Sequence, residues 1–89
     1  MVKLNCKVNN PMGLTSKYCA ELVAEANRAS KCSLTLKCDE GEADLKSIMN
    51  MMSLVIKTGA EFTIEIIGED EECVKVKFEK LLLSLKLLK

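Results

Sequence analysis

The chain has 89 residues, enough for one domain spanning residues 1–89, and its 13 basic and 13 acidic residues cancel to a formal charge of zero. Hydrophobic residues make up 48 %, which argues against disorder, and no run of roughly 18 apolar residues is present that could span a membrane. With no basic excess and only 3 % aromatic residues, the composition argues against nucleic-acid binding.

Histidine is absent from the sequence, which excludes Ser-His and Cys-His nucleophiles, imidazole acid–base catalysis and phosphohistidine chemistry. We therefore expect no enzyme activity and no cofactor. The N-terminal residues 1–6 are too polar for a signal peptide, and no cysteine pair forms C-x-x-C. We predict a cytoplasmic protein with no metal site, whose reduced and mostly buried cysteines are Cys6, Cys19, Cys32, Cys38 and Cys73.

Two kinds of periodicity organise the first half of the chain. Apolar and polar residues alternate over residues 2–8, which predicts a half-buried strand, and again over residues 32–38. Between them, residues 15–29 follow a helical period, with Thr15 or Ser16 as the N-cap. After a turn, residues 42–44 are predicted to form a short returning strand. The apolar face of the helix consists of Cys19, Leu22, Val23 and Ala26.

The second half contains two further helices around one strand. A short, methionine-rich helix is predicted from Ser47, because serine is a favoured N-cap. Residues 61–66 alternate as a fourth strand, and Gly68 ends it. The last helix is expected to open on the acidic residues 69–72, which complement the helix dipole better than they suggest a metal site. Its predicted buried stripe is Val74, Phe78, Leu81, Leu85 and Leu88.

The resulting order of elements is β-α-β-β-α-β-α. Four amphipathic strands need one covered face, and three helices with single apolar stripes supply the cover. We therefore predict an α+β open-faced two-layer sandwich. In it, a four-stranded antiparallel sheet is covered on one face by three helices and faces water on the other.

Two segments contain more apolar side chains than one buried stripe needs. In the short helix, Ile48, Met49 and Met52 are candidates for a partner-facing surface, and the alternative is that they fill the core. In the last helix, Leu83 and Leu87 are four residues apart and are predicted to share an exposed face. That face would support a weak homodimer, and scattered surface leucines are the milder alternative.

Two helix starts are candidates for anion chemistry. The loop at residues 9–16 leads into free backbone N–H groups, Gly13 permits a close approach, and Lys17 adds a positive charge. Ser47, preceded by Lys46, is the second such position, because a phosphate on a cap serine would lie at the positive end of a helix. Taken alone, each feature is also compatible with an ordinary capped helix.

The order of elements and two local strings resemble the HPr family of the bacterial phosphotransferase system along essentially the whole chain. The string LKSIMNMMSL at residues 45–54 is similar to the regulatory-serine segment of HPr from Gram-positive bacteria. The string GLTSK at residues 13–17 aligns with the family's active-site loop, Gly-Ile/Val-His-Ala-Arg. The resemblance thus implies the HPr fold and two functional regions.

At the active-site loop this sequence departs from the family. Thr15 stands where the family's phosphorylated histidine is expected, Lys17 replaces the arginine, and Tyr18 replaces the following proline. In the family, that histidine takes phosphate from enzyme I and passes it to enzyme IIA. A threonine hydroxyl does not support such transfer, because its phosphoester is a poor donor and its oxygen needs a base to attack.

The resemblance then points to histidine-less HPr-like paralogues that keep the regulatory serine and act in carbon catabolite repression. It implies that HPr kinase/phosphorylase modifies Ser47 and that the phosphoprotein is a corepressor of a LacI-type catabolite repressor. By the same resemblance, Ile48, Met49 and Met52 match the hydrophobic docking patch, and Lys17 lies where an arginine anchors the complex. The alternative is a constitutive HPr-fold interaction module or homodimer that is not phosphorylated.

Overall fold

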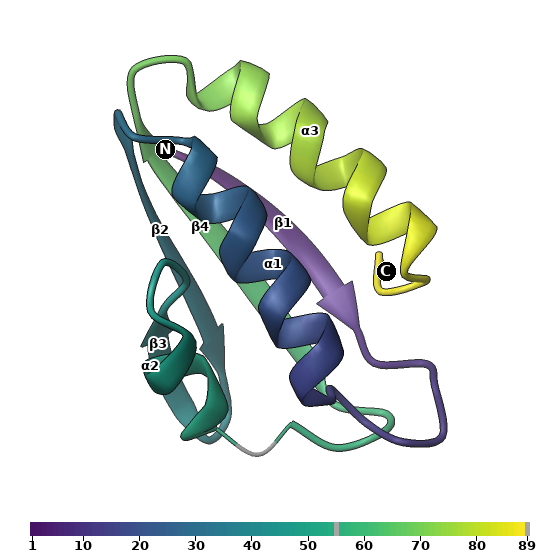
Figure 1. Cartoon of the computed structure of the whole chain (residues 1–89). Helices are drawn as coiled ribbons and strands as arrows, with labels where there is room; N and C mark the ends of the chain where they lie inside the picture. Colours follow the sequence, from purple (N-terminus) through teal and green to yellow (C-terminus); the bar gives the residue numbers. More distant parts are fainter. Residues whose placement is uncertain (55, 89) are drawn as a thin grey trace.

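The computed structural model describes residues 1–54 and 56–88. Its element order, shown in Figure 1, is the predicted β-α-β-β-α-β-α. The elements are β1 (Val2–Lys7), α1 (Ser16–Arg28), β2 (Cys32–Cys38), β3 (Gly41–Asp44), α2 (Ile48–Met52), β4 (Glu61–Gly68) and α3 (Glu71–Ser84).

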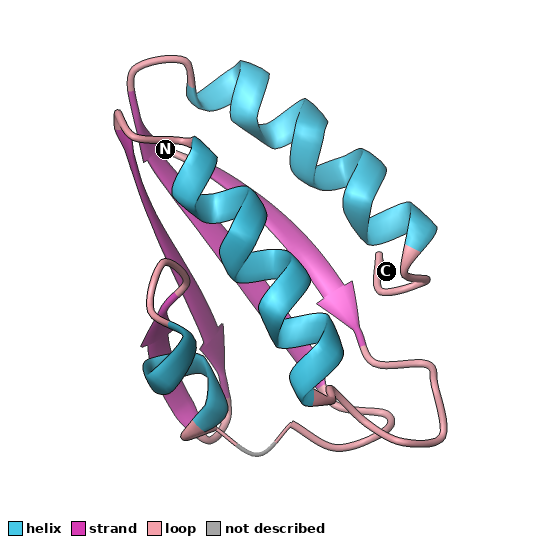
Figure 2. Ribbon diagram, in the orientation of Figure 1, coloured by secondary structure: helices cyan, strands magenta, loops and turns pink. Residues whose placement is uncertain are grey.

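The strands form one antiparallel sheet in the order β1-β4-β2-β3. All three helices lie on one face of it (Figure 2), which confirms the predicted two-layer sandwich. The alternation explains the two faces: Ile64 of β4 is buried, whereas the next residue, Glu65, is on the opposite face. There Glu65 forms ion pairs with Lys3 of β1 (3.7 Å) and Lys37 of β2 (3.2 Å).

The core fills the space between the sheet and the helices. Cys19, Leu22 and Ala26 of α1 are buried, as the helical period predicts. Cys6 of β1 is fully buried, and this burial raises the pKa of its thiol to about 12; burial also raises the pKa of the Cys19 thiol. All five cysteines are free thiols. Cys73, however, is exposed, and Cys38 is half-buried.

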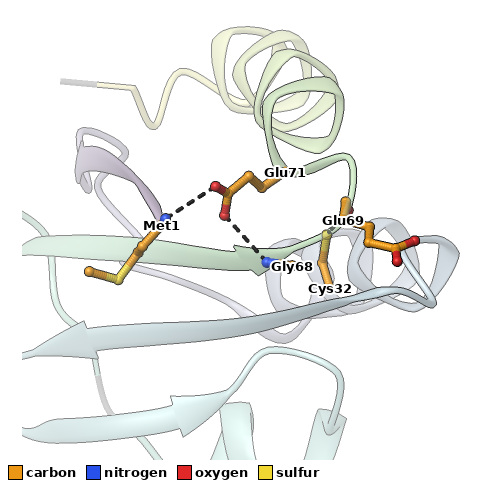
Figure 3. A network of polar contacts seen from close by, with 5 residues as sticks. All are labelled: Met1, Cys32, Gly68, Glu69 and Glu71. Atoms are coloured by element: carbon orange, nitrogen blue, oxygen red, sulfur yellow. Dashed lines mark hydrogen bonds and ion pairs between the residues drawn. The ribbon is translucent and has the colours of Figure 1, made fainter.

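The last helix begins at Glu71, two residues later than the predicted acidic start at Glu69. Asp70 adopts a left-handed backbone conformation (φ 60°) that turns the chain from β4 into α3. The Glu71 carboxylate then accepts hydrogen bonds from the Met1 amine (3.1 Å) and from the Gly68 N–H (3.3 Å), as Figure 3 shows. These contacts tie the first turn of α3 to the ends of β1 and β4.

The C-terminal segment corrects the prediction for Leu83 and Leu87. Leu83 is 63 % exposed, but Leu87 is fully buried, so the two do not share an exposed face. The helix ends at Ser84, and Lys86 takes a left-handed conformation (φ 60°) that turns the chain back. The Leu87 carbonyl oxygen then accepts from the N–H of Lys7 at 2.8 Å. Because the chain leaves the helix at this turn, helical spacing no longer relates Leu83 to Leu87. The predicted dimer surface is therefore not formed.

The predicted buried stripe of the last helix is confirmed only at its centre. Phe78 is fully buried, and so is Leu82, which the prediction left out. The other four members pack against the core while remaining partly exposed: Val74, Leu81, Leu85 and Leu88. Among residues 1–54 and 56–88, no helix is both long and apolar enough to cross a bilayer.

Candidate functional site

Ser47 is the N-cap of α2, as predicted. Its Oγ accepts a hydrogen bond from the N–H of Asn50 at 3.2 Å, which satisfies one of the free donors of the first turn. Its own N–H donates to the carbonyl oxygen of Asp44 at 3.0 Å. The serine is half-buried, and these two hydrogen bonds fix its local conformation.

Directly after Ser47, three apolar side chains are exposed. Ile48 is 37 % exposed, Met49 82 % and Met52 55 %, and we call these three residues the α2 surface. Met51 is the one methionine of this helix that is buried, beneath the same turn. The exposure confirms the prediction that this segment has more apolar side chains than the core accommodates. Methionine side chains of this kind adapt to the shape of a partner.

The loop before α1 is held in place by the chain that follows α2. The Leu14 N–H donates to the carbonyl oxygen of Ile56 at 2.9 Å. Gly13 has a positive φ of 78°, and a Cβ there would lie 3.0 Å from the same oxygen, so a larger residue would strain this approach. The segment that follows α2 thus returns to the start of α1 (Figure 1).

Thr15 is the N-cap of α1 by backbone geometry, with extended φ and ψ of −77° and 168°. Its hydroxyl makes no cap hydrogen bond, so the expected side-chain cap is not formed at this residue. Lys17 is exposed in the first turn of the same helix. Met12, which is 80 % exposed on the same loop, was not predicted as a candidate residue, because a single methionine between Pro11 and Gly13 has no periodic pattern.

The structure does not bring Thr15 and Ser47 together. Thr15 begins α1, whereas Lys46, next to Ser47, hydrogen-bonds to Asn27 and Ala29 at the other end of that helix. The candidate residues therefore form two regions: Thr15 and Lys17 at the start of α1, and Ser47 with the α2 surface.

The contribution of Asn27 was not predicted from the sequence either. Its side chain donates to the carbonyl oxygen of Lys46 at 3.1 Å, across 19 residues of sequence. A long-range bond of this kind leaves no periodic or motif signal. Nothing in the described ranges, 1–54 and 56–88, gathers three or more His, Cys, Asp or Glu side chains into a group that could hold a metal ion.

Comparison with known proteins gives a consistent family. The model of the family described as "PTS HPr component phosphorylation site" matches residues 2–83. The phosphocarrier protein HPr of Mycoplasma capricolum is 36 % identical over 72 residues, covering 81 % of this chain and 80 % of that protein. The HPr-like protein Crh of Bacillus subtilis is 39 % identical over 72 residues, covering 81 % and 84 %.

Solved structures agree with the sequence comparison. The histidine-containing phosphocarrier protein of Mycoplasma superposes with a TM-score of 0.90 at 30 % identity, covering 99 % of both chains. Crh of Bacillus subtilis, described as a dimer formed by domain swapping, superposes with a TM-score of 0.69 at 34 % identity, covering 94 % of this chain and 95 % of that one. Relatives of both kinds, HPr and Crh, thus match at similar identity.

Proposed function

The chain belongs to the HPr family, and from this premise we propose that it is a regulatory member that carries no phosphate from enzyme I. Its activity is set instead by phosphorylation of Ser47 in the cytoplasm. It has no catalytic site of its own and acts by binding partner proteins. One observation carries the proposal: Ser47 lies directly before the exposed α2 surface, in a chain that has no histidine.

The residue at the family's phosphocarrier position supports this regulatory role. The family's histidine aligns with Thr15, and a threonine hydroxyl has neither the nucleophilicity nor the labile phosphate bond that a relay needs. The raised pKa of the Cys19 thiol, one turn further along α1, keeps it protonated and makes a cysteine relay a poor substitute.

Phosphorylation would convert the α2 region into a composite surface. In this reaction Ser47 Oγ attacks the γ-phosphorus of ATP, ADP leaves, and the hydroxyl proton passes to a base of the kinase. The product gains about −1.5 to −2 charges next to three exposed apolar side chains. A LacI-type catabolite repressor would read both features. Lys17 would add a positive charge to this contact, although lysine lacks the bidentate fork of arginine.

A second function deserves a test because Met49 and Met52 are already exposed without any phosphate. In that case the chain is a constitutive interaction module that binds its partner through the α2 surface alone. The two functions differ in one measurable respect: whether binding depends on the phosphate at Ser47.

Incubation of the purified chain with HPr kinase and ATP tests the proposal. We expect one phosphate per chain, located at Ser47 by mass spectrometry and absent from Ser47→Ala. Ser53→Ala is the matched control, because Ser53 caps the other end of the same helix and should leave the labelling unchanged. No phosphate on the wild-type chain, or phosphate on another residue, would reject the regulatory function.

Incubation with enzyme I and phosphoenolpyruvate tests the absence of carrier activity. We expect no acid-labile phosphate on the wild-type chain. Thr15→His restores an imidazole at the family's position and is expected to restore weak labelling, since Lys17 and Tyr18 also differ from the family. Stoichiometric labelling of the unmodified chain would show that it is a carrier after all.

A further inference from the structure

Two side chains fasten the segment before Ser47 to the end of α1. Asn27 Nδ2 donates to the carbonyl oxygen of Lys46 at 3.1 Å, and Lys46 Nζ donates to the carbonyl oxygen of Ala29 at 2.8 Å. The two hydrogen bonds run in opposite directions between the same two segments. We call this pair of bonds the Asn27–Lys46 clamp.

Within α1, we find no structural role for the Asn27 side chain other than this clamp. Asparagine is a poor helix former, and this residue is exposed and does not belong to the core. Its Nδ2 also donates to the carbonyl oxygen of Val23, one turn earlier, at 2.9 Å. Both amide protons are thereby used, and the side chain is fixed in the orientation that reaches Lys46.

Lys46 completes the clamp from the other side. Its ammonium group lies at the C-terminal end of α1, where the helix dipole favours a positive charge. Its backbone N–H donates to Asp44 Oδ1 at 3.0 Å, and the next N–H, that of Ser47, donates to the Asp44 carbonyl oxygen at 3.0 Å. Residues 44–47 are therefore held from within and also anchored to α1.

We infer that Asn27 and Lys46 are positioning residues that hold Ser47 in the conformation a protein kinase phosphorylates. This inference rests on the proposed function, in which Ser47 is the modified residue. Without the clamp, only a fraction of molecules presents the Ser47 hydroxyl in that conformation. The apparent affinity of the kinase falls by that fraction, so its KM rises while kcat, measured at saturation, is retained.

Asn27→Leu tests the clamp separately from helix stability. Leucine is the better helix former at this exposed position and offsets part of the lost hydrogen bonding, so the melting temperature should stay within about 5 °C of the wild type. Loss of the hydrogen bond to Lys46 is expected to raise the KM of HPr kinase about five-fold, with kcat within about two-fold. Amide hydrogen exchange should become faster in residues 45–51 and stay unchanged in the sheet. Asn27→Gln retains a donor and should recover part of the KM.

Asn9→Leu is the matched control. Asn9 is also exposed, and its Nδ2 donates to the carbonyl oxygen of another lysine, Lys86, at 3.3 Å. This control should leave the KM and the exchange of residues 45–51 as in the wild type. Lys46→Met is the second variant, and combining it with Asn27→Leu should raise the KM less than the product of the single effects, since both act on one unit.

The outcomes separate this inference from the proposed function. If the wild-type chain takes no phosphate, the proposed function fails and the inference fails with it. If the wild type is phosphorylated and Asn27→Leu has an unchanged KM, only the inference is rejected. A raised KM accompanied by a melting temperature more than about 5 °C lower or by faster exchange in the sheet, or an equal rise in Asn9→Leu, would indicate a general loss of structure and would also reject it.

Discussion

In α2, three of the four apolar residues stay exposed, whereas in the C-terminal segment Leu87 is fully buried and Leu83 is exposed. Both segments contain more apolar side chains than one helical stripe accommodates. The short α2 offers a single inward position, which Met51 occupies. The longer segment instead leaves the helix at Lys86, and this turn places Leu87 against β1. The apolar surplus therefore stays exposed in α2, whereas at the C-terminus the backbone folds back and buries Leu87, although Leu83 remains exposed.

The largest expected effect contrasts the two leucines. Leu87→Ala should lower the free energy of unfolding by about 2–5 kcal/mol, because it removes a fully buried side chain and leaves a cavity. Leu83→Ala should change it by less than about 0.5 kcal/mol, as expected for an exposed residue. Urea denaturation followed by circular dichroism measures both values. Equal effects would show that the C-terminal turn does not distinguish the two residues.

The second prediction concerns pH and the β1 residue beside this segment. Cys6 is paired with Leu88 by a β-bridge, and burial raises its folded-state pKa to about 12, above the ordinary thiol value of 9.0. Because the folded state keeps this thiol protonated, its contribution to stability is complete below pH 9.0 and is lost as the pH rises towards about 12. The slope from this group is about 1.4 kcal/mol per pH unit.

Denaturation between neutral and alkaline pH checks this prediction. Cys6→Ala should make the alkaline decline shallower, although it lowers the stability at neutral pH by removing buried volume. Cys73→Ala, which removes an exposed thiol, is the control and should leave the slope as in the wild type. An unchanged slope in Cys6→Ala would mean that the thiol becomes accessible to water at alkaline pH before the chain unfolds.

These contrasts show which features could be predicted from the sequence. Alternation and helical spacing are local properties, so the strands, α1 and the Ser47 cap were predicted correctly. The exposure of α2 followed from counting apolar residues against the length of the helix. Backbone turns were not predictable in this way, because Asp70 and Lys86 adopt positive φ without being glycine. Contacts that depend on such turns were missed for the same reason, whereas the contact of Asn27 with Lys46 was missed because a bond between distant segments leaves no local pattern.

The smallest expected effect on stability is at the α2 surface. Met52→Asp replaces a side chain that is 55 % exposed, so the free energy of unfolding should change by less than about 0.5 kcal/mol. Binding of the Ser47-phosphorylated chain to a LacI-type repressor should nevertheless be lost, because the aspartate puts a second negative charge into the apolar part of the surface.

Isothermal titration calorimetry measures this binding, and Val76→Asp on α3, 50 % exposed, is the control for a surface charge elsewhere. Retained binding by Met52→Asp would remove the α2 surface from the interface, whereas a large loss of stability would show that Met52 belongs to the core with Met51.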